Sequence, residues 1–280
     1  MRMIFCGFGK LGKVCLDTLI QNKYDVVFVL THKDMSDHSV DSYCEVNNIP
    51  YSYIDVRKEG NKLLEQILIE NPDYLVSVNY RYILPSKIIN SVEVALNLHG
   101  SLLPKYRGRT PHVWSIINGE TYSGVTSHLI DEGVDTGNII KQIRIKIEED
   151  DTGYDLLIKF EKEYPDLLLD SLTDIQSGIL PKVQNESQGS YFGRRTPEMG
   201  YIDFLKNTIE VINFVRAQAK PYPGAYYYLK NGSKIIIHKI IQCSDSISKL
   251  DTIGVIEKID NDYYVRCKDN ILKIVDYEII

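Results

Sequence analysis

The chain has 280 residues, of which 44% are hydrophobic and 25% are charged, so it is long enough for two folded units and has an ordinary globular composition. Its formal net charge of -6 at pH 7 and its pI of about 5.6 argue against a protein whose main role is to grip a polyanion. A substrate with one diphosphate stays compatible with this charge, because two or three local basic residues suffice to hold it.

The five cysteines are odd in number and show no CxxC spacing, so structural disulfides and a zinc cage are not expected, and we predict no metal. The first residues, MRMIFCGFG, have the pattern of a strand and lack the apolar stretch of a signal peptide. No apolar run approaches the roughly 18 residues of a membrane-spanning helix. We therefore expect a cytoplasmic protein that does not act on a membrane.

The first half of the chain alternates strand and helix patterns. Apolar, β-branched runs predict strands at 1–7, 25–31, 51–54, 74–78 and 92–98, and amphipathic stretches predict helices at 11–23, 36–48 and 62–70. Strands that alternate with helices form right-handed crossovers. The order therefore predicts an α/β fold with a Rossmann-like, doubly wound and mainly parallel sheet.

The second half changes character after residue 180. Residues 124–130 predict another strand, 139–147 alternate like an edge strand, and a long helix is expected from Thr152, which has capping-box spacing to Asp155. Residues 181–205 are rich in Gly, Ser, Pro and Asn and are interpreted as a connector. A helix at 208–219 and short strands follow, at 225–230, 234–241, 252–259, 262–267 and 271–276, with a hairpin turn at Asn231-Gly232. We expect domains at 1–180 and 206–280, the second small and β-rich.

Glycines 7, 9 and 12 form a GxGxxG pattern between a predicted strand and helix, where a dinucleotide fingerprint belongs. The acid expected about 20 residues later is poorly placed, because the second strand ends in THKD at 31–34. Glycines at these positions also let a helix pack closely on a strand, and we favour that interpretation. A non-catalytic or NAD-linked protein of the same fold is the alternative.

The most informative stretch is NLHGSLLPKYRG at 97–108. Asn97 and His99 lie at the carboxyl end of a predicted parallel strand, on one face, at the edge where open α/β sheets bind ligands. An amide can donate to a developing oxyanion and an imidazole can accept a proton from an attacking amine, which is the chemistry of acyl transfer. The plainer alternative is a histidine satisfied by a turn carbonyl and an asparagine that caps the strand.

A second stretch, DEGVDTGNI at 131–139, follows the predicted strand at 124–130 and is too rich in glycine for a helix. A carboxylate at Asp135 would orient the histidine and stabilise its charged form. An ordinary Asp-rich turn remains the alternative from spacing alone.

Together these stretches resemble the folate-dependent formyltransferases, whose motifs are Asn-x-His-x-Ser-Leu-Leu-Pro and Asp-x-Gly-x-Asp-Thr-Gly. The resemblance extends to LVSVNYRYILP at 75–85, to Ile202-Asp203 and to RAQAKPYPGA at 216–225, so it covers most of the chain. One departure is Gly100, where methionyl-tRNA formyltransferases usually have proline. We expect it to alter the shape of the loop more than the chemistry.

The resemblance implies direct transfer of a formyl group from N10-formyltetrahydrofolate to an amine, with no metal. By position, it implies a catalytic triad of Asn97, His99 and Asp135. It also implies a folate site formed by Asn79, Tyr80, Arg81, Tyr82, Ile83, Leu84 and Asp131.

Three amine acceptors are compatible with this resemblance. Residues 201–280 contain 11 Lys and Arg against 10 Asp and Glu, and this net charge of +1 argues against methionyl-tRNA, so we predict no nucleic-acid partner. A purine-pathway glycinamide ribonucleotide enzyme would normally lack the β-rich tail. The length, the YRGRTP run at 106–111 and PYPGA at 221–225 are most similar to the sugar N-formyltransferases of bacterial surface-polysaccharide pathways such as O-antigen synthesis.

Our predicted acceptor is a dTDP-linked 4-amino-4,6-dideoxyhexose such as dTDP-4-amino-4,6-dideoxyglucose, with the 3-amino isomer and methionyl-tRNA as alternatives. The predicted substrate-binding residues are Ser101, Lys105, Arg107, Arg109 and Tyr222. The three basic side chains would meet the diphosphate, unless they form only a solvated basic turn. The edge strands of the β-rich tail favour a homodimer.

The sequence contains further aromatic residues that are candidates for contact with a nucleotide base. Tyr191, Tyr201 and Tyr222 are candidates for stacking on a nucleotide base. Trp114 follows on a predicted helix and is expected to lie in the core rather than at a ligand.

Overall fold

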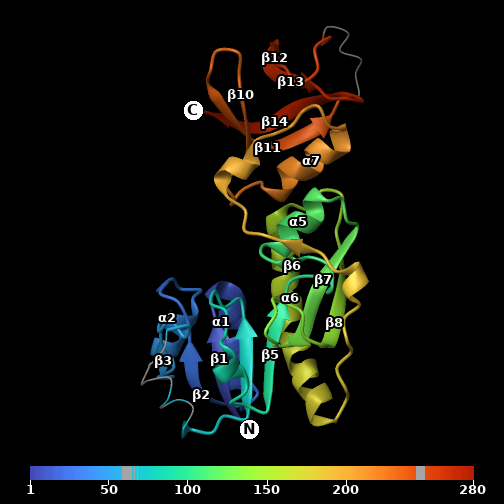
Figure 1. The fold of residues 1–280 in the computed structure, drawn as a ribbon. Helices are drawn as coiled ribbons and strands as arrows, with labels where there is room; N and C mark the ends of the chain where they lie inside the picture. Colours follow the sequence, from blue (N-terminus) through green and yellow to red (C-terminus); the bar gives the residue numbers. More distant parts are fainter. Residues whose placement is uncertain (59–64, 66, 68, 244–249) are drawn as a thin grey trace. The chain divides into compact units, whose positions relative to one another are not determined.

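The computed structural model describes residues 1–58, 65, 67, 69–243 and 250–280, which form two compact units (Figure 1). The first unit comprises Met1–Gly108, Gly124–Ile145 and Lys159–Tyr191, and the second comprises Arg109–Ser123, Lys146–Ile158 and Phe192–Ile280. The second unit thus includes two segments that come before residue 180. Our expected division at 180 and 205 stays a prediction.

The first unit is built on a seven-stranded sheet with the order β3-β2-β1-β4-β5-β7-β8. Its first five strands are mutually parallel, and β7 runs antiparallel to β5. This order confirms the Rossmann-like, mainly parallel fold and the edge position of β8. The strands are β1 (Arg2–Gly7), β2 (Asp25–Leu30), β3 (Tyr51–Ser52), β4 (Tyr74–Val78), β5 (Val94–His99), β7 (Tyr122–Leu129) and β8 (Ile139–Lys146).

The central strands are apolar on both faces because they are covered on both sides, as parallel strands require. Every residue of β4 is buried, and so are the last five residues of β1. Ile4, Leu30, Leu75 and Ile88 belong to one core cluster of this unit. This buried centre fixes the carboxyl ends of β4 and β5, where the loops of the candidate site begin.

Helix α1 (Gly9–Gln21) packs against β1, β2, β4 and α2 (Val40–Val46). A Cβ atom at Gly12 would lie 2.9 Å from the Val40 side chain and 3.1 Å from the carbonyl carbon of Gly7. The close-packing interpretation is therefore confirmed for Gly12. The helix expected at 62–70 falls largely on 62–64, 66 and 68, which lie outside the described residues.

The long helix α6 (Gly153–Gln176) begins at the predicted capping box. The N–H of Asp155 donates to Thr152 Oγ1 at 3.1 Å, and the N–H of Thr152 donates to Asp155 Oδ2 at 2.9 Å. The remaining short elements are α4 (Ser86–Ile89), β6 (Arg107–Gly108), α5 (Pro111–Ile117), β9 (Tyr191–Phe192) and two 3₁₀ turns at Glu186–Gln188 and Pro197–Gly200.

The second unit contains an antiparallel five-stranded sheet with the order β10-β11-β14-β13-β12, and α7 (Thr208–Ala217) packs on it. Asn231 and Gly232 lie in the hairpin between β10 and β11, as predicted. The strands are β10 (Ala225–Tyr228), β11 (Lys234–Gln242), β12 (Ile256–Ile259), β13 (Asp262–Arg266) and β14 (Ile271–Ile279). No helix in the described ranges is both long and apolar enough to cross a membrane.

Candidate active site

Asn97 and His99 lie at the carboxyl end of β5, between β4 and β7. His99 is buried, with 7% of its surface exposed, and Asn97 is partly exposed. Leu98, between them, is directed to the other face and is buried in the core. The strand period of two therefore brings the amide and the imidazole to one face, as the sequence predicts.

Asp135 lies in the loop that follows β7, in a left-handed backbone conformation with φ of 56°. Two glycines hold this loop close to its strand. A Cβ atom at Gly137 would lie 1.8 Å from the carbonyl oxygen of Leu129, and one at Gly133 would lie 2.0 Å from Thr136 Oγ1. Glycine is required at 137, because a backbone carbonyl cannot move aside as the Thr136 side chain can, and the loop folds tightly enough to bring Asp135 to β5.

The Asp135 carboxylate faces His99. Its Oδ2 atom lies 3.5 Å from His99 Nδ1 and accepts a 2.8 Å hydrogen bond from the backbone N–H of Gly108. The Nε2 atom of His99 donates to the carbonyl oxygen of Tyr106 at 2.8 Å. The predicted pairing of His99 with Asp135 is therefore present at Nδ1. The hydrogen bond to a turn carbonyl, which was the alternative interpretation, is present at Nε2.

The pKa of Asp135 lies well below its usual value. Burial alone would raise this pKa, but His99, His128 and the N–H of Gly108 together outweigh it and stabilise the ionised carboxylate. Asp135 therefore supplies a fixed negative charge beside His99 throughout the neutral range.

His128 was not predicted, yet it lies in the same cluster. It is on β7, opposite Asn97 in the register, and its Nε2 atom lies 3.2 Å from Asn97 Nδ2 and 3.5 Å from Asp135 Oδ1. His128 could have been identified from its position in the sequence, near the end of the predicted strand that precedes the acidic loop.

Two residues of the loop after β5 support its shape. Ser101 is fully buried, and its hydroxyl donates to the carbonyl oxygen of Lys105 at 2.7 Å. A Cβ atom at Gly100 would lie 3.0 Å from the ring of Phe160, so the space beside this loop is narrow. In this structure Ser101 is bonded within its turn, and its predicted contact with a substrate stays a prediction.

The predicted folate loop follows β4 directly. Asn79 has a φ of 55°, and its side chain donates to the carbonyl oxygen of Phe8 at 3.1 Å. Ile83 is 67% exposed, whereas Leu84 is buried in the core. Asp131 accepts from the N–H of Gly133 and from Thr136 Oγ1, so it orders the loop that carries Asp135.

His32 lies at the carboxyl end of β2 and is surrounded by aromatic rings. The sequence did not predict it as a site residue. The rings of Tyr80 and Tyr82 lie 4.8 and 4.5 Å from its ring, and the guanidinium of Arg81 lies 3.7 Å from the ring of Phe8. Burial and then Arg81 lower the pKa of His32, and its neutral Nε2 accepts a 3.1 Å bond from the Arg81 N–H. Tyr80, Arg81 and Tyr82 thus form one cluster.

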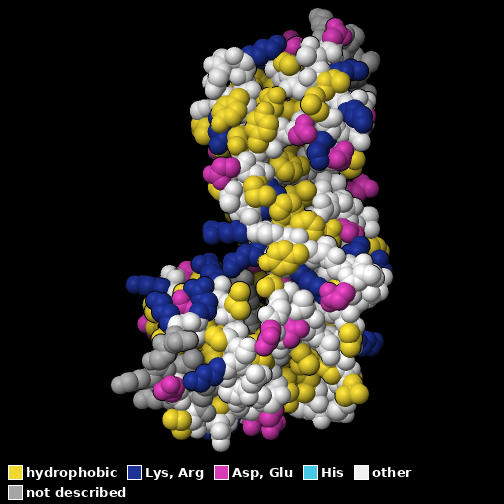
Figure 2. Space-filling view, viewed as in Figure 1, with side chains coloured by type: hydrophobic (Ala, Val, Ile, Leu, Met, Phe, Trp, Pro, Cys, Tyr) yellow, Lys and Arg dark blue, Asp and Glu magenta, His cyan; other side chains and the backbone are white. Residues whose placement is uncertain are grey.

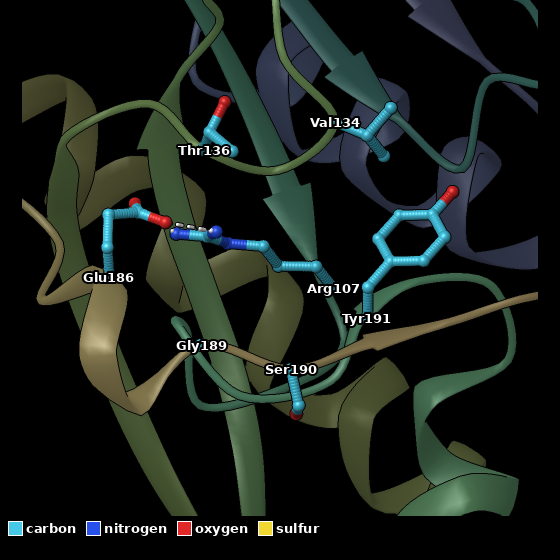
Figure 3. A pocket seen from close by; sticks show the side chains of 7 residues that line it. All are labelled: Arg107, Val134, Thr136, Glu186, Gly189, Ser190 and Tyr191. Carbon is cyan, nitrogen blue, oxygen red and sulfur yellow. Dashed lines mark hydrogen bonds and ion pairs between the residues drawn. The ribbon is translucent and has the colours of Figure 1, made fainter.

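Figure 3 shows a pocket of about 430 Å³ in the first unit, between the Asp135 loop and the segment at 186–191. Its lining residues are Arg107, Val134, Thr136, Glu186, Gly189, Ser190 and Tyr191. The buried guanidinium of Arg107 is directed at Glu186, to which it donates two hydrogen bonds of 2.8 and 2.7 Å. Tyr191 is 62% exposed, so its ring is accessible beside the pocket.

The remaining predicted substrate residues fall in different places. Lys105 is exposed in the first unit, whereas Arg109 and Tyr222 belong to the second. Tyr222 Oη lies 2.9 Å from Nε2 of His112, whose pKa burial lowers to about 4. The ring of Tyr201 stacks on Tyr227 at 5.3 Å.

The expectation for Trp114 was wrong, because this residue is only partly buried in the second unit. Its indole N–H donates to the carbonyl oxygen of Gly193 at 3.1 Å, and the guanidinium of Arg195 lies 4.7 Å from its ring. The sequence pattern correctly placed Trp114 on a helix, α5. It did not reveal the polar contacts with Gly193 and Arg195.

The arrangement in the first unit suits acyl transfer. Asn97 offers amide N–H groups, His99 offers an imidazole, and Asp135 holds a negative charge 3.5 Å from that imidazole. Within the described ranges, no group of three or more His, Cys, Asp or Glu side chains is arranged to hold a metal ion.

Similarities to known proteins agree with this chemistry. Residues 1–172 match the family model described as "Formyl transferase", and residues 194–279 match "Formyl transferase, C-terminal domain". The chain is 30% identical to the methionyl-tRNA formyltransferase of Caldanaerobacter subterraneus subsp. tengcongensis over an alignment of 289 positions, which covers 99% of this chain and 92% of the relative.

Two solved structures have a similar fold. One is the N-formyltransferase of Helicobacter canadensis in complex with folinic acid and dTDP-3-aminofucose, with a TM-score of 0.74, 24% identity and coverage of 99% of each chain. The other is a 4-N formyltransferase of Francisella tularensis, with a TM-score of 0.66 and 28% identity, over 84% of this chain and 96% of that one.

Proposed function

This chain belongs to the formyl transferase family, and from that premise we propose that it transfers the formyl group of N10-formyltetrahydrofolate to the amino group of a nucleotide-linked sugar. The observation that carries the proposal is the meeting of Asn97, His99 and Asp135 at the carboxyl end of β5. An amide, an imidazole and a carboxylate at one sheet edge suit the attack of an amine on a formyl carbon.

The proposed reaction is a direct transfer. The amine nitrogen forms a bond to the formyl carbon, and the resulting tetrahedral oxyanion accepts a hydrogen bond from Asn97. His99 donates a second one once its Nε2 exchanges the bond to the Tyr106 carbonyl oxygen. Collapse breaks the bond from the formyl carbon to N10 of the folate. The proton that the amine loses passes through His99 or Asp135, and N10 gains one, so the products are a formamide and tetrahydrofolate.

We propose that the folate lies against the loop at 79–84. Ile83 offers an exposed apolar side chain there, and the Tyr80, Arg81 and Tyr82 cluster offers aromatic and cationic surfaces. Asp131 would act by ordering the Asp135 loop, because its carboxylate is bonded within that loop.

For the acceptor, the distribution of charge favours a small molecule over tRNA. Residues 201–280 carry a net charge of only +1, and on the visible face of the second unit Lys and Arg side chains are interspersed with acidic and apolar ones (Figure 2). A protein that holds an acceptor stem would gather them into a basic patch. Methionyl-tRNA stays a second candidate because of the 30% identical relative.

We propose a dTDP-linked 4-amino-4,6-dideoxyhexose as the acceptor, with the 3-amino isomer as the alternative. The similarity to a 4-N formyltransferase supports the first, and the fold shared with a protein that binds dTDP-3-aminofucose supports the second. Exposed Lys105 is the proposed contact of the diphosphate in the first unit. Arg109 and Tyr222, which belong to the second unit, stay predictions from the sequence. Arg107 contributes to this site once its bonds to Glu186 are exchanged.

We further propose that the protein acts in surface-polysaccharide synthesis, is cytoplasmic and forms a homodimer. Native mass spectrometry, which preserves noncovalent assemblies, measures the number of chains in the assembly directly. A mass of one chain at micromolar concentration would contradict the homodimer.

The reaction is tested with a panel of acceptors and N10-formyltetrahydrofolate, with products read by mass spectrometry. The panel holds the dTDP-4-amino and dTDP-3-amino dideoxyhexoses, a UDP-4-amino sugar, a GDP-4-amino sugar and methionyl-tRNA. We expect a formyl mass gain on a dTDP-amino sugar. Formylation of the tRNA alone would contradict the proposed acceptor and leave the reaction class standing.

A further inference from the structure

His128 contacts two members of the proposed triad but is not one of them. It lies on β7 opposite Asn97 of β5, and only 3% of its surface is exposed. Its Nε2 atom is 3.2 Å from Asn97 Nδ2 and 3.5 Å from Asp135 Oδ1. A buried ring in this position influences both groups directly.

The second ring nitrogen of His128 decides the direction of the hydrogen bond. Nδ1 lies 2.7 Å from the carbonyl oxygen of Leu129, and a carbonyl oxygen only accepts, so Nδ1 carries the proton. In the neutral ring Nε2 is then an acceptor. Asn97 therefore presents an N–H to it, because a reversed amide would set Oδ1 against the lone pair of Nε2.

We propose that His128 is a positioning residue that fixes the orientation of the Asn97 amide. One N–H of Asn97 is tied to His128, and the other is left to donate to the oxyanion. An amide can rotate between two orientations of nearly equal shape, and only one of them offers a donor where negative charge develops. This role rests on the proposed function, because that assigns Asn97 to the oxyanion.

Two substitutions and a matched control test the role. His128→Leu removes the acceptor, and we expect kcat to fall about 10- to 100-fold, since misplacing a catalytic group by about 1 Å costs up to about 10²-fold. KM for both substrates should change by less than about twofold. His128→Gln should recover part of kcat, because its carbonyl oxygen can accept from Asn97.

The control is Ser127→Ala, on the neighbouring position of β7. Ser127 is also fully buried, but it points to the other face of the sheet, and its hydroxyl has no hydrogen-bond partner within the described part of the chain. We expect this variant to keep wild-type kcat. A fall in kcat for His128→Leu no larger than for Ser127→Ala would overturn the inference.

One further measurement separates positioning from a merely structural role. Nitrogen NMR of the ligand-free wild-type protein at neutral pH should show a protonated Nδ1 and a bare Nε2 on His128. A proton on Nε2 would overturn the inference. If no amino sugar is formylated, the proposed function fails. The NMR result still shows, independently of activity, whether Nε2 of His128 can accept a hydrogen bond from Asn97.

Discussion

Arg107 and Glu186, 79 residues apart in the chain, form a two-point ion pair in which Nη1 donates to Oε2 at 2.8 Å and Nη2 donates to Oε1 at 2.7 Å. Gln184 accepts from Nη2 of the same guanidinium at 2.7 Å, and its amide donates to the carbonyl oxygens of Asp135 and Gly137. The segment after α6 is thereby tied to the loop that carries the proposed catalytic carboxylate.

Arg107→Lys should lower the melting temperature measurably. An ammonium group cannot replace the planar fork that bonds Glu186 and Gln184 together. For a protein of this size, each kcal/mol lost lowers the melting temperature by roughly 2–4 °C. Glu186→Gln is the matched comparison and should cost less, because its amide oxygen still accepts and its side chain is exposed. A smaller loss in Arg107→Lys than in Glu186→Gln, by differential scanning fluorimetry, would contradict this account of the pair.

Asp135→Asn should reduce kcat by about 10²- to 10⁴-fold, because it removes the negative charge that lies 3.5 Å from Nδ1 of His99. Stability gives an independent readout. The folded-state pKa of Asp135 is lowered, so the stabilisation from its charge is complete above the unfolded pKa of about 3.9 and is lost as the pH falls below it. Urea unfolding at pH 7 and pH 3 should therefore show a larger difference between wild type and variant at pH 7. An equal difference at both values would contradict the assignment.

Gly137→Ala should abolish both the loop geometry and turnover. Its Cβ atom would lie 1.8 Å from the carbonyl oxygen of Leu129, so the loop must move away from the end of β7 and carry Asp135 with it. Gly193→Ala is the control, since a Cβ atom there meets nothing within 4 Å. Circular dichroism and single-turnover kinetics would measure both variants. Normal turnover in Gly137→Ala would show that the tight loop is not needed.

The salt dependence of the reaction should be shallow. A single diphosphate releases few counterions, whereas a tRNA contacted at several phosphates loses affinity steeply as salt rises. The measurement is kcat/KM for the amino sugar between low and moderate sodium chloride, plotted as logarithms. A slope of several units would indicate a polyanionic substrate.

The sequence alone predicted the elements whose pattern is local. The alternation of apolar β-branched strands with helices gave the parallel sheet, and the period of two along β5 brought Asn97 and His99 to one face. Thr152 and Asp155 cap α6 as their spacing predicted.

What the sequence missed depends on contacts between distant segments. His128 lay within a predicted strand and nothing in the sequence singled it out, since only the pairing of β7 with β5 brings it to Asn97. Arg107 was predicted to be available to a diphosphate, but Glu186, far along the chain, already binds it in this structure. Trp114 was expected in the core, but Gly193 and Arg195 give it polar partners.

The central claim is tested most directly by following an isotopically labelled formyl group. N10-formyltetrahydrofolate labelled in the formyl carbon is incubated with the dTDP-4-amino sugar and either wild-type protein or His99→Ala, and the sugar is analysed by mass spectrometry. We expect that the wild-type protein moves the label to the sugar nitrogen and that His99→Ala does so at least about 10²-fold more slowly. Label transfer at the same rate by both proteins, or no transfer to this sugar by the wild type, would contradict the proposed function.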